Sequence, residues 1–216
     1  MPLRDVRVAR PRILFVGINP GLRSEQLGHH FAGKGNPFWR LLHAARLTPV
    51  LLDPAEDQRL AEWRIGLTNL CPRASRSAAE LDKEELAAGR SALLAKIDEL
   101  EPELVALVGV TLYRQVFPKA EGGPGAGLKP ERIGGARVFV LPNPSGLNAS
   151  YPGFAHKLVW FRKLARLVSA AVRDQRRTKA PRSGPSRRTR RACRRPPRPR
   201  ARSGACRPLG GDPSAR

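Results

Sequence analysis

An asparagine in a tight turn is the first residue whose type and position could serve chemistry. Asn19 ends the apolar run Ile13–Ile18 and precedes Pro20-Gly21, which forces the chain to turn. Its amide can donate and accept hydrogen bonds but cannot ionise, so it could hold a water molecule in line with an electrophilic carbon without activating it strongly. Such a group suits a reaction whose leaving group departs largely by itself. Because Asn-Pro-Gly turns are most often structural, this one needs supporting residues nearby.

The same loop contains the cluster His29-His30-Phe31, an unusual combination for a segment exposed to solvent. An exposed aromatic ring can stack on a nucleic-acid base, a contact worth roughly 1–3 kcal/mol. The alternative is that Phe31 anchors the loop in the core. No carboxylate lies close in sequence to either histidine, so a metal site or a Cys/His dyad has little support.

A second loop with chemical potential is Pro142-Asn143-Pro144-Ser145-Gly146-Leu147-Asn148. Two prolines stiffen it, and Ser145 and Asn148 carry groups that can contact phosphates. Leu147 is an apolar residue in an otherwise polar turn. Proteins insert apolar wedges of this kind into a base stack, although a single exposed leucine needs no special explanation.

Short apolar runs predict the strands that position these loops, because a strand covered on both faces lacks alternation. Helices are predicted by amphipathic spacing and capping residues between the strands. This order predicts an α/β fold with a mostly parallel, four-stranded sheet, whose carboxyl edge would hold both loops, 19–36 and 142–153. Residues 118–131 are predicted to be a mobile surface loop. The predicted strands are Ile13–Ile18, Ile65–Leu70, Leu104–Val108 and Val138–Leu141, and the predicted helices are Phe38–Arg46, Asp53–Trp63, Asp82–Leu100, Thr111–Phe117 and His156–Val172.

Charge divides the chain into unequal parts. The formal net charge is +22, and the segment 173–216 holds sixteen Arg or Lys and two Asp. We therefore expect an N-terminal lead-in (1–12), a folded domain (13–172) and a disordered Arg/Pro-rich tail (173–216). The tail is either a basic arm that holds phosphates or an extension without a dedicated role.

Cysteine content and hydropathy limit the environment of the protein. The three cysteines Cys71, Cys193 and Cys206 show no zinc-ligand spacing and no disulfide framework, and they are too few for an iron–sulfur cluster. Neither an N-terminal signal nor a membrane span is visible. These features predict an intracellular, cytoplasmic protein, associated with the nucleoid if it is bacterial.

Together these motifs resemble those of the mismatch-specific uracil-DNA glycosylase and thymine-DNA glycosylase family, within the uracil-DNA glycosylase superfamily. The likeness covers about residues 12–170. It implies a three-layer α/β/α sandwich without metal or cofactor, acting as a monomer on double-stranded DNA that contains a mismatched or damaged base. The matching segments are Gly17-Ile18-Asn19-Pro20-Gly21, Gly28-His29-His30-Phe31, Asn36-Pro37-Phe38-Trp39, Gly66-Leu67-Thr68-Asn69-Leu70 and Pro142-Asn143-Pro144-Ser145-Gly146-Leu147.

The resemblance also implies roles for individual residues. Asn19 would position the hydrolytic water, and Phe31 would stack on a flipped base. The backbone of Ile18, with Asn69, would read the base edge. The remaining expected contacts are His30 and Ser24 beside the base, and Ser145, Gly146, Leu147 and Asn148 on the DNA, with Leu147 in the gap left by the flipped nucleotide.

The reaction implied is hydrolysis of the bond between uracil, or related bases such as thymine and ethenocytosine, and deoxyribose in a G·U or G·T mismatch. No lysine stands in the motifs as a lyase nucleophile, so a monofunctional enzyme that leaves an abasic site is expected. A different uracil-DNA glycosylase specificity on the same fold stays open. A non-catalytic basic DNA-binding protein would explain the charge but not the two loops. A nucleotide-binding regulator is disfavoured because no P-loop or Gly-x-Gly-x-x-Gly fingerprint follows the first strand.

Overall fold

The computed structural model describes residues 3–145 and 150–179, with side chains as far as residue 170. This part of the chain lies within one compact unit that ends at Lys179. Its elements, in chain order, are β1 (Ile13–Gly17), α1 (Leu22–Leu27), α2 (Phe38–Ala44), the 3-10 helix η1 (Pro54–Trp63), β2 (Ile65–Asn69), the 3-10 turn η2 (Ala78–Glu80), α3 (Lys83–Leu100), β3 (Leu104–Val108), α4 (Val110–Val116), β4 (Gly127–Ile133), β5 (Ala136–Leu141) and α5 (Gly153–Lys179).

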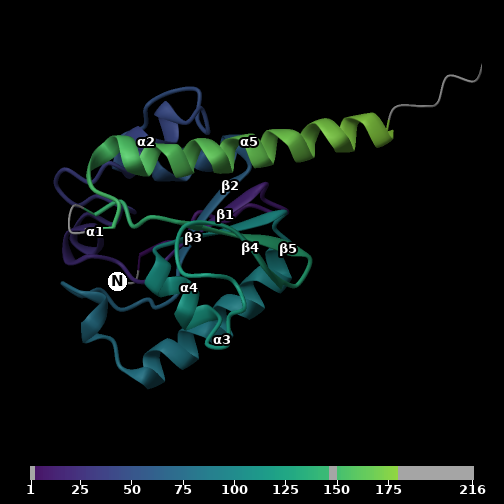
Figure 1. The fold of residues 1–216 in the computed structure, drawn as a ribbon. Coiled ribbons are helices and arrows are strands. Elements are labelled where there is room, and N and C mark those ends of the chain that lie inside the picture. Colours follow the sequence, from purple (N-terminus) through teal and green to yellow (C-terminus); the bar gives the residue numbers. More distant parts are fainter. Residues whose placement is uncertain (1–2, 146–149, 180–216) are drawn as a thin grey trace, which may run out of the picture. The chain divides into compact units, whose positions relative to one another are not determined.

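The sheet has the order β2-β1-β3-β5-β4, and its first four strands are parallel. Alternate residues of each strand face opposite layers. Ile13 and Phe15 of β1 belong to the core beneath α2, η1 and α5, whereas Leu14 and Val16 belong to the core beneath α3 and α4. Figure 1 shows α2 and α5 on one side of the sheet and α3 and α4 on the other. The predicted three-layer α/β/α sandwich is therefore confirmed.

The predicted number of strands was wrong, because the sheet has five. Strand β4 begins at Gly127, within the segment 118–131 that was predicted to be a loop. It ends at Ile133 and pairs antiparallel with β5. It is an edge strand with alternating half-buried and exposed residues, and its register shifts around Pro130. Proline and charged residues are tolerated at an edge because one side of the strand needs no ladder hydrogen bonds. These same residues made the segment look like a loop.

Three helical predictions also need correction. The loop 22–36 contains helix α1. The segment after Asp53 has the expected capping box and a proline at the first position, but it winds as a 3-10 helix with a kink at Glu56. Helix α5 runs from Gly153 to Lys179, so it continues into the basic segment that was expected to be disordered from residue 173.

The structure also bears on the N-terminal segment and on the expectation that no segment spans a membrane. Within the expected lead-in, Val6 forms an antiparallel bridge with Leu67 of β2 through two backbone hydrogen bonds of 2.9 and 3.1 Å. Within the described residues, no helix has the length and apolar character required to cross a bilayer. Gly146, Leu147, Asn148 and the segment 180–216 lie outside the described residues.

Candidate active site

A cavity of about 370 Å³ lies at the carboxyl ends of β1, β2 and β3, where ligands bind in sheets of this type. The loop after β5 closes one side of it through Asn143 and Ser145. Every candidate residue that the structure describes lines this one cavity, although the residues come from four separate segments: Ile18, Asn19, Ser24, His30, Phe31, Asn69 and Ser145.

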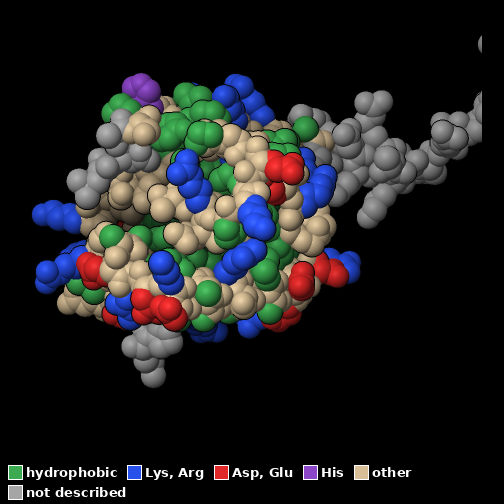
Figure 2. All heavy atoms as spheres, turned by 60° about the horizontal axis from the view of Figure 1, so that its bottom comes forward, with side chains coloured by type: hydrophobic (Ala, Val, Ile, Leu, Met, Phe, Trp, Pro, Cys, Tyr) green, Lys and Arg blue, Asp and Glu red, His purple; other side chains and the backbone are tan. Residues whose placement is uncertain are grey.

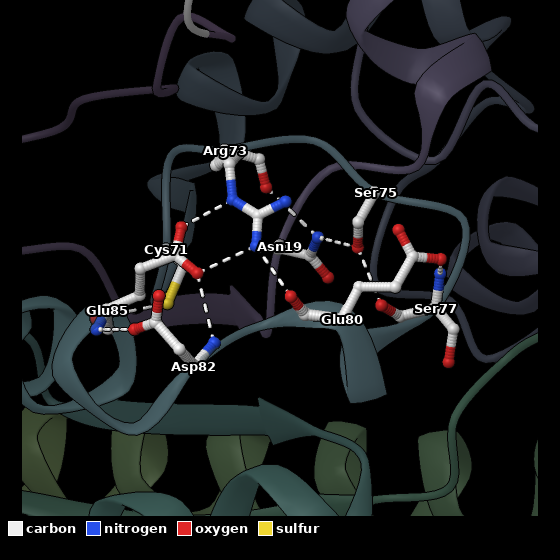
Figure 3. A network of polar contacts seen from close by, with 8 residues as sticks. All are labelled: Asn19, Cys71, Arg73, Ser75, Ser77, Glu80, Asp82 and Glu85. Atoms are coloured by element: carbon white, nitrogen blue, oxygen red, sulfur yellow. Dashed lines mark hydrogen bonds and ion pairs between the residues drawn. The ribbon is translucent and has the colours of Figure 1, made fainter.

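The amide of Asn19 is held in one orientation by the protein. Its Nδ2 donates to the backbone oxygen of Arg73 at 3.0 Å and to Oγ of Ser75 at 2.7 Å (Figure 3). A backbone oxygen can only accept, so the nitrogen must face it, and both amide hydrogens are then used. Oδ1 is the atom that is left to accept a hydrogen bond from another molecule in the cavity.

The side chain of Asn69 lies directly over Gly17, its partner across β1 and β2. A Cβ atom at position 17 would stand 2.4 Å from Oδ1 of Asn69, far inside van der Waals contact, and 3.9 Å from Cζ of Phe31. Gly17 is therefore required for Asn69 to lie where it does. The carbonyl oxygen of Ile18, next in the chain, accepts the N–H of Cys71 at 2.8 Å.

Phe31 is anchored in the core and also accessible from the cavity. Its ring stacks on that of Phe38, with centroids 3.9 Å apart and planes 19° apart, yet the residue is only half-buried. Its backbone has φ of 51°, a left-handed conformation that is uncommon for a bulky residue. The two interpretations of Phe31, stacking partner and core anchor, are thus compatible.

His30 is 1% exposed and is held from both its ring and its backbone. Its Nε2 lies 3.1 Å from the backbone oxygen of Arg4, and its N–H donates to Oδ2 of Asp57 at 3.0 Å. Burial lowers the pKa of His30, with smaller opposing effects from Arg4 and Asp57, so its ring is neutral at pH 7. His30 forms the wall of the cavity in a fixed, uncharged state.

Asp57 is the carboxylate that sequence reasoning missed. It is 1% exposed, comes from η1, and lies 3.5 Å from Nδ1 of His29 through Oδ1. Sequence distance hid its contact with His30, since Asp57 follows His30 by 27 residues. Among the described residues, no group of three or more His, Cys, Asp or Glu side chains lies close enough together to hold a metal ion.

Ser24 and the N-terminal segment complete the wall. Oγ of Ser24 accepts the N–H of Ala32 at 3.1 Å, which closes the loop between α1 and α2. Leu3 lines the cavity directly. Asp5, two residues later, accepts a hydrogen bond of 2.7 Å from Thr68 in β2 and pairs with Lys96 of α3 at 2.6 Å. The wall of the cavity therefore includes Leu3, which comes from the segment that was expected to be a lead-in.

The loop after β5 is fixed by a lysine that the sequence analysis did not single out. Lys157 of α5 is 3% exposed, and its Nζ donates to the backbone oxygens of Pro144 at 3.0 Å and Ser145 at 2.9 Å. Burial lowers the pKa of this ammonium group. Within the loop, Oδ1 of Asn143 accepts the N–H of Ser145 at 2.9 Å.

A second cavity of about 610 Å³ adjoins the first. The two share Ile18, Ala78, Val108, Asn143 and Ser145, and the second extends toward the start of α4 and Tyr151. Because they adjoin, the two cavities together have room for a ligand longer than a single planar ring.

Comparison with known proteins identifies the family of the chain and a solved structure with a similar fold. Residues 5–165 match the family described as the uracil DNA glycosylase superfamily. A solution NMR structure of a Methanosarcina acetivorans protein, provisionally described as a uracil DNA glycosylase, resembles this chain with a TM-score of 0.56 and 19% identity. The match covers 78% of this chain and 97% of that one. At this identity the structural likeness concerns the fold alone.

Proposed function

The chain belongs to the uracil-DNA glycosylase superfamily, and from this premise we propose that it is a monofunctional DNA glycosylase for mismatched double-stranded DNA. It flips uracil out of a G·U pair and hydrolyses the N-glycosidic bond, leaving an abasic site for base excision repair. Thymine in G·T pairs and ethenocytosine are further candidate substrates.

One observation carries this proposal: the fixed amide of Asn19 in a cavity lined by Phe31 and Asn69. Since both amide hydrogens are used by Arg73 and Ser75, Oδ1 accepts a hydrogen bond from the hydrolytic water. This hydrogen bond orients the water so that one of its lone pairs points at the anomeric carbon of the sugar. The amide stays uncharged at every pH of interest, so it orients the water rather than deprotonating it.

An orienting group is sufficient because the base leaves before the water is fully bonded. The bond breaks with oxocarbenium character, and hydrogen bonds to the departing base anion lower the barrier. The backbone of Ile18 and the amide of Asn69 are the proposed partners of the base edge, while Phe31 stacks on the ring. Flipping costs a few kcal/mol and costs least for a mismatched base, which favours G·U over A·U.

A lyase step is not part of the proposal. Such a step needs an amine nucleophile, and among the described residues that line the cavity there is no lysine. Lys157 of α5, which contacts the loop after β5, is buried and uses its ammonium group on two backbone oxygens.

Positive charge supports DNA as the partner. Basic side chains (blue) are spread over the face drawn in Figure 2. A hollow of about 480 Å³ between the end of α2 and the side of α5 is lined by Arg46, Arg162 and Arg166. No acidic side chain forms an ion pair with these arginines among the described residues. Arginines without an acidic partner, two of them on the long helix α5, suit contact with phosphates.

The test is cleavage of labelled duplexes that each carry one G·U, A·U, G·T or ethenocytosine site, with and without alkali. Alkali-dependent strand breaks at G·U would support a monofunctional glycosylase, and the order of rates would give the specificity. Strand breaks without alkali would contradict the monofunctional assignment. Binding to all duplexes with no cleavage would favour the alternative, a non-catalytic basic DNA-binding protein.

A further inference from the structure

The segment from Cys71 to Ser77 runs beside the turn that carries Asn19. The N–H of Cys71 donates to the carbonyl oxygen of Ile18 at 2.8 Å, and the N–H of Ser75 donates to that of Pro20 at 3.1 Å. The two segments are therefore joined on both sides of Asn19, and a displacement of one displaces the other.

Arg73 anchors this segment through its side chain. Its Nε and one terminal nitrogen contact the two carboxylate oxygens of Glu85 at 2.5 and 2.7 Å, and the same terminal nitrogen donates to the backbone oxygen of Glu80 at 2.7 Å (Figure 3). A guanidinium that meets both oxygens of a carboxylate is fixed in direction as well as in distance. Lysine, a single point of charge, cannot reproduce this geometry.

Both acceptors of the Arg73 side chain are themselves fixed by capping boxes. Glu85 accepts the N–H of Asp82 at 3.0 Å at the start of the 18-residue helix α3. Glu80 accepts the N–H of Ser77 at 3.1 Å in η2. Hydrogen bonding to Arg73 lowers the pKa of Glu85 to about 2, so the ion pair persists at any pH used for an assay.

The backbone of the same arginine meets the amide of the cavity. Its carbonyl oxygen accepts Nδ2 of Asn19 at 3.0 Å. Ser75, two residues later, accepts the other amide hydrogen at 2.7 Å, and its own hydroxyl donates to the backbone oxygen of Ser77 at 2.7 Å. The orientation of Asn19 thus depends on a backbone segment whose place is set by the side chain of Arg73.

We propose that Arg73 is a positioning residue: its two-point contact with Glu85 holds its own carbonyl oxygen against Asn19 and so aligns the amide that orients the water. The kinetic consequence rests on the proposed glycosylase function, whereas the alignment of the amide does not. Exposed ion pairs contribute little to stability. The contact with Glu85 therefore acts on geometry, and its loss changes the rate more than the fold.

The first experiment needs no DNA. It records the NMR signals of the Asn19 side-chain amide, in protein labelled with nitrogen-15, for the native chain, Arg73→Ala and Arg59→Ala. Arg59 is the matched control, because it also pairs with glutamates, its side chain is 44% exposed against 47% for Arg73, and it does not line the cavity. We expect faster hydrogen exchange and a shifted amide pair in Arg73→Ala only. Unchanged signals in Arg73→Ala would overturn the proposal.

The second experiment measures single-turnover cleavage of a G·U duplex. Arg73→Ala should lower the rate about 10- to 100-fold, the size of effect expected when a reacting group is misplaced by about 1 Å. Affinity for a duplex that contains the non-cleavable 2′-fluoro-2′-deoxyuridine should stay within about 2-fold, and Arg73→Lys should recover only part of the rate. An equal fall in Arg59→Ala, or a loss confined to affinity, would contradict a positioning role.

The third measurement combines the two positions. In an Asn19→Ala background, Arg73→Ala should add less than about a 2-fold further fall, because residues that act as one unit are not additive. A full additional fall would show that Arg73 acts independently of Asn19 and would overturn the proposal. If the native protein cleaves no duplex, the proposed function fails, and the amide signals alone decide whether Arg73 positions Asn19.

Discussion

Adding a methyl group at Gly17 should damage the site without damaging the core. The new Cβ would stand 2.4 Å from Oδ1 of Asn69, whereas ordinary contacts begin near 3.4 Å, so the amide must move by about 1 Å. Gly17 has no left-handed backbone conformation, and the other atoms nearest to the new Cβ would lie at ordinary contact distances of 3.6 and 3.9 Å. We therefore expect Gly17→Ala to lower kcat/KM for a G·U duplex about 10- to 100-fold, with little change in the free energy of unfolding.

Two further variants make this prediction decisive. Gly66→Ala is the matched control, because its Cβ would also stand too close to its neighbours, 2.9 Å from Cδ1 of Leu14 and 3.3 Å from the backbone oxygen of Val6, but away from the cavity. It should lower stability and leave the cleavage rate of the folded protein unchanged. In an Asn69→Ala background the clash at position 17 disappears, so Gly17→Ala should then cost less than about 2-fold. If Gly17→Ala lowered the single-turnover rate equally in both backgrounds, the placement of Asn69 would not be its cause.

Three other predictions follow from the described contacts. Lys157→Met keeps the buried volume but leaves two backbone oxygens without their donor. It should lower the free energy of unfolding by about 1–3 kcal/mol in urea titrations. An unchanged midpoint would contradict the claim that Lys157 stabilises the loop after β5. Burial lowers the pKa of His30, so as the pH falls the unfolded chain binds a proton at this residue before the folded chain does. The free energy of unfolding should therefore fall as the pH drops below about 6.5, and this fall should be smaller in His30→Gln. Equal pH profiles would refute the claim that His30 is buried in its neutral form. Replacing Arg162 and Arg166 by Ala should reduce the slope of log affinity against log salt by about 0.9 for each DNA phosphate that these side chains neutralise, while the single-turnover rate of bound enzyme stays unchanged; an unaltered slope would remove this surface from the DNA interface.

The buried strands were predictable because their physics is local. Runs such as Leu104–Val108 are apolar throughout, since both faces of the strand are covered, and their length of five residues suits a strand rather than a helix. The edge strand β4 was not predictable in this way. Its exposed face, Pro130 and flanking glycines match the composition of a loop, and only pairing with β5 makes it a strand.

The same distinction applies to the site. It could be predicted that Asn19, Phe31 and Ser145 line one cavity, because their loops come after β1 and β5 and the carboxyl edge of a parallel sheet brings such loops together. Asp57, Lys157 and Arg73 could not be singled out, since each acts through a partner that the fold supplies from elsewhere in the chain. Asp57 and Lys157 hold the backbone of the two loops and Arg73 contacts the side-chain amide of Asn19, and no local pattern marks either task.

The most direct test of the account compares native protein with Asn19→Ala on a labelled G·U duplex, under single-turnover conditions and in parallel with binding to the non-cleavable analogue. Loss of the fixed Oδ1 should lower the cleavage rate about 10²- to 10³-fold, in line with the removal of one pre-organised polar group, while affinity changes by less than about 3-fold. A native protein that cleaves G·U, together with an Asn19→Ala variant that cleaves it equally fast, would contradict the claim that this amide orients the hydrolytic water.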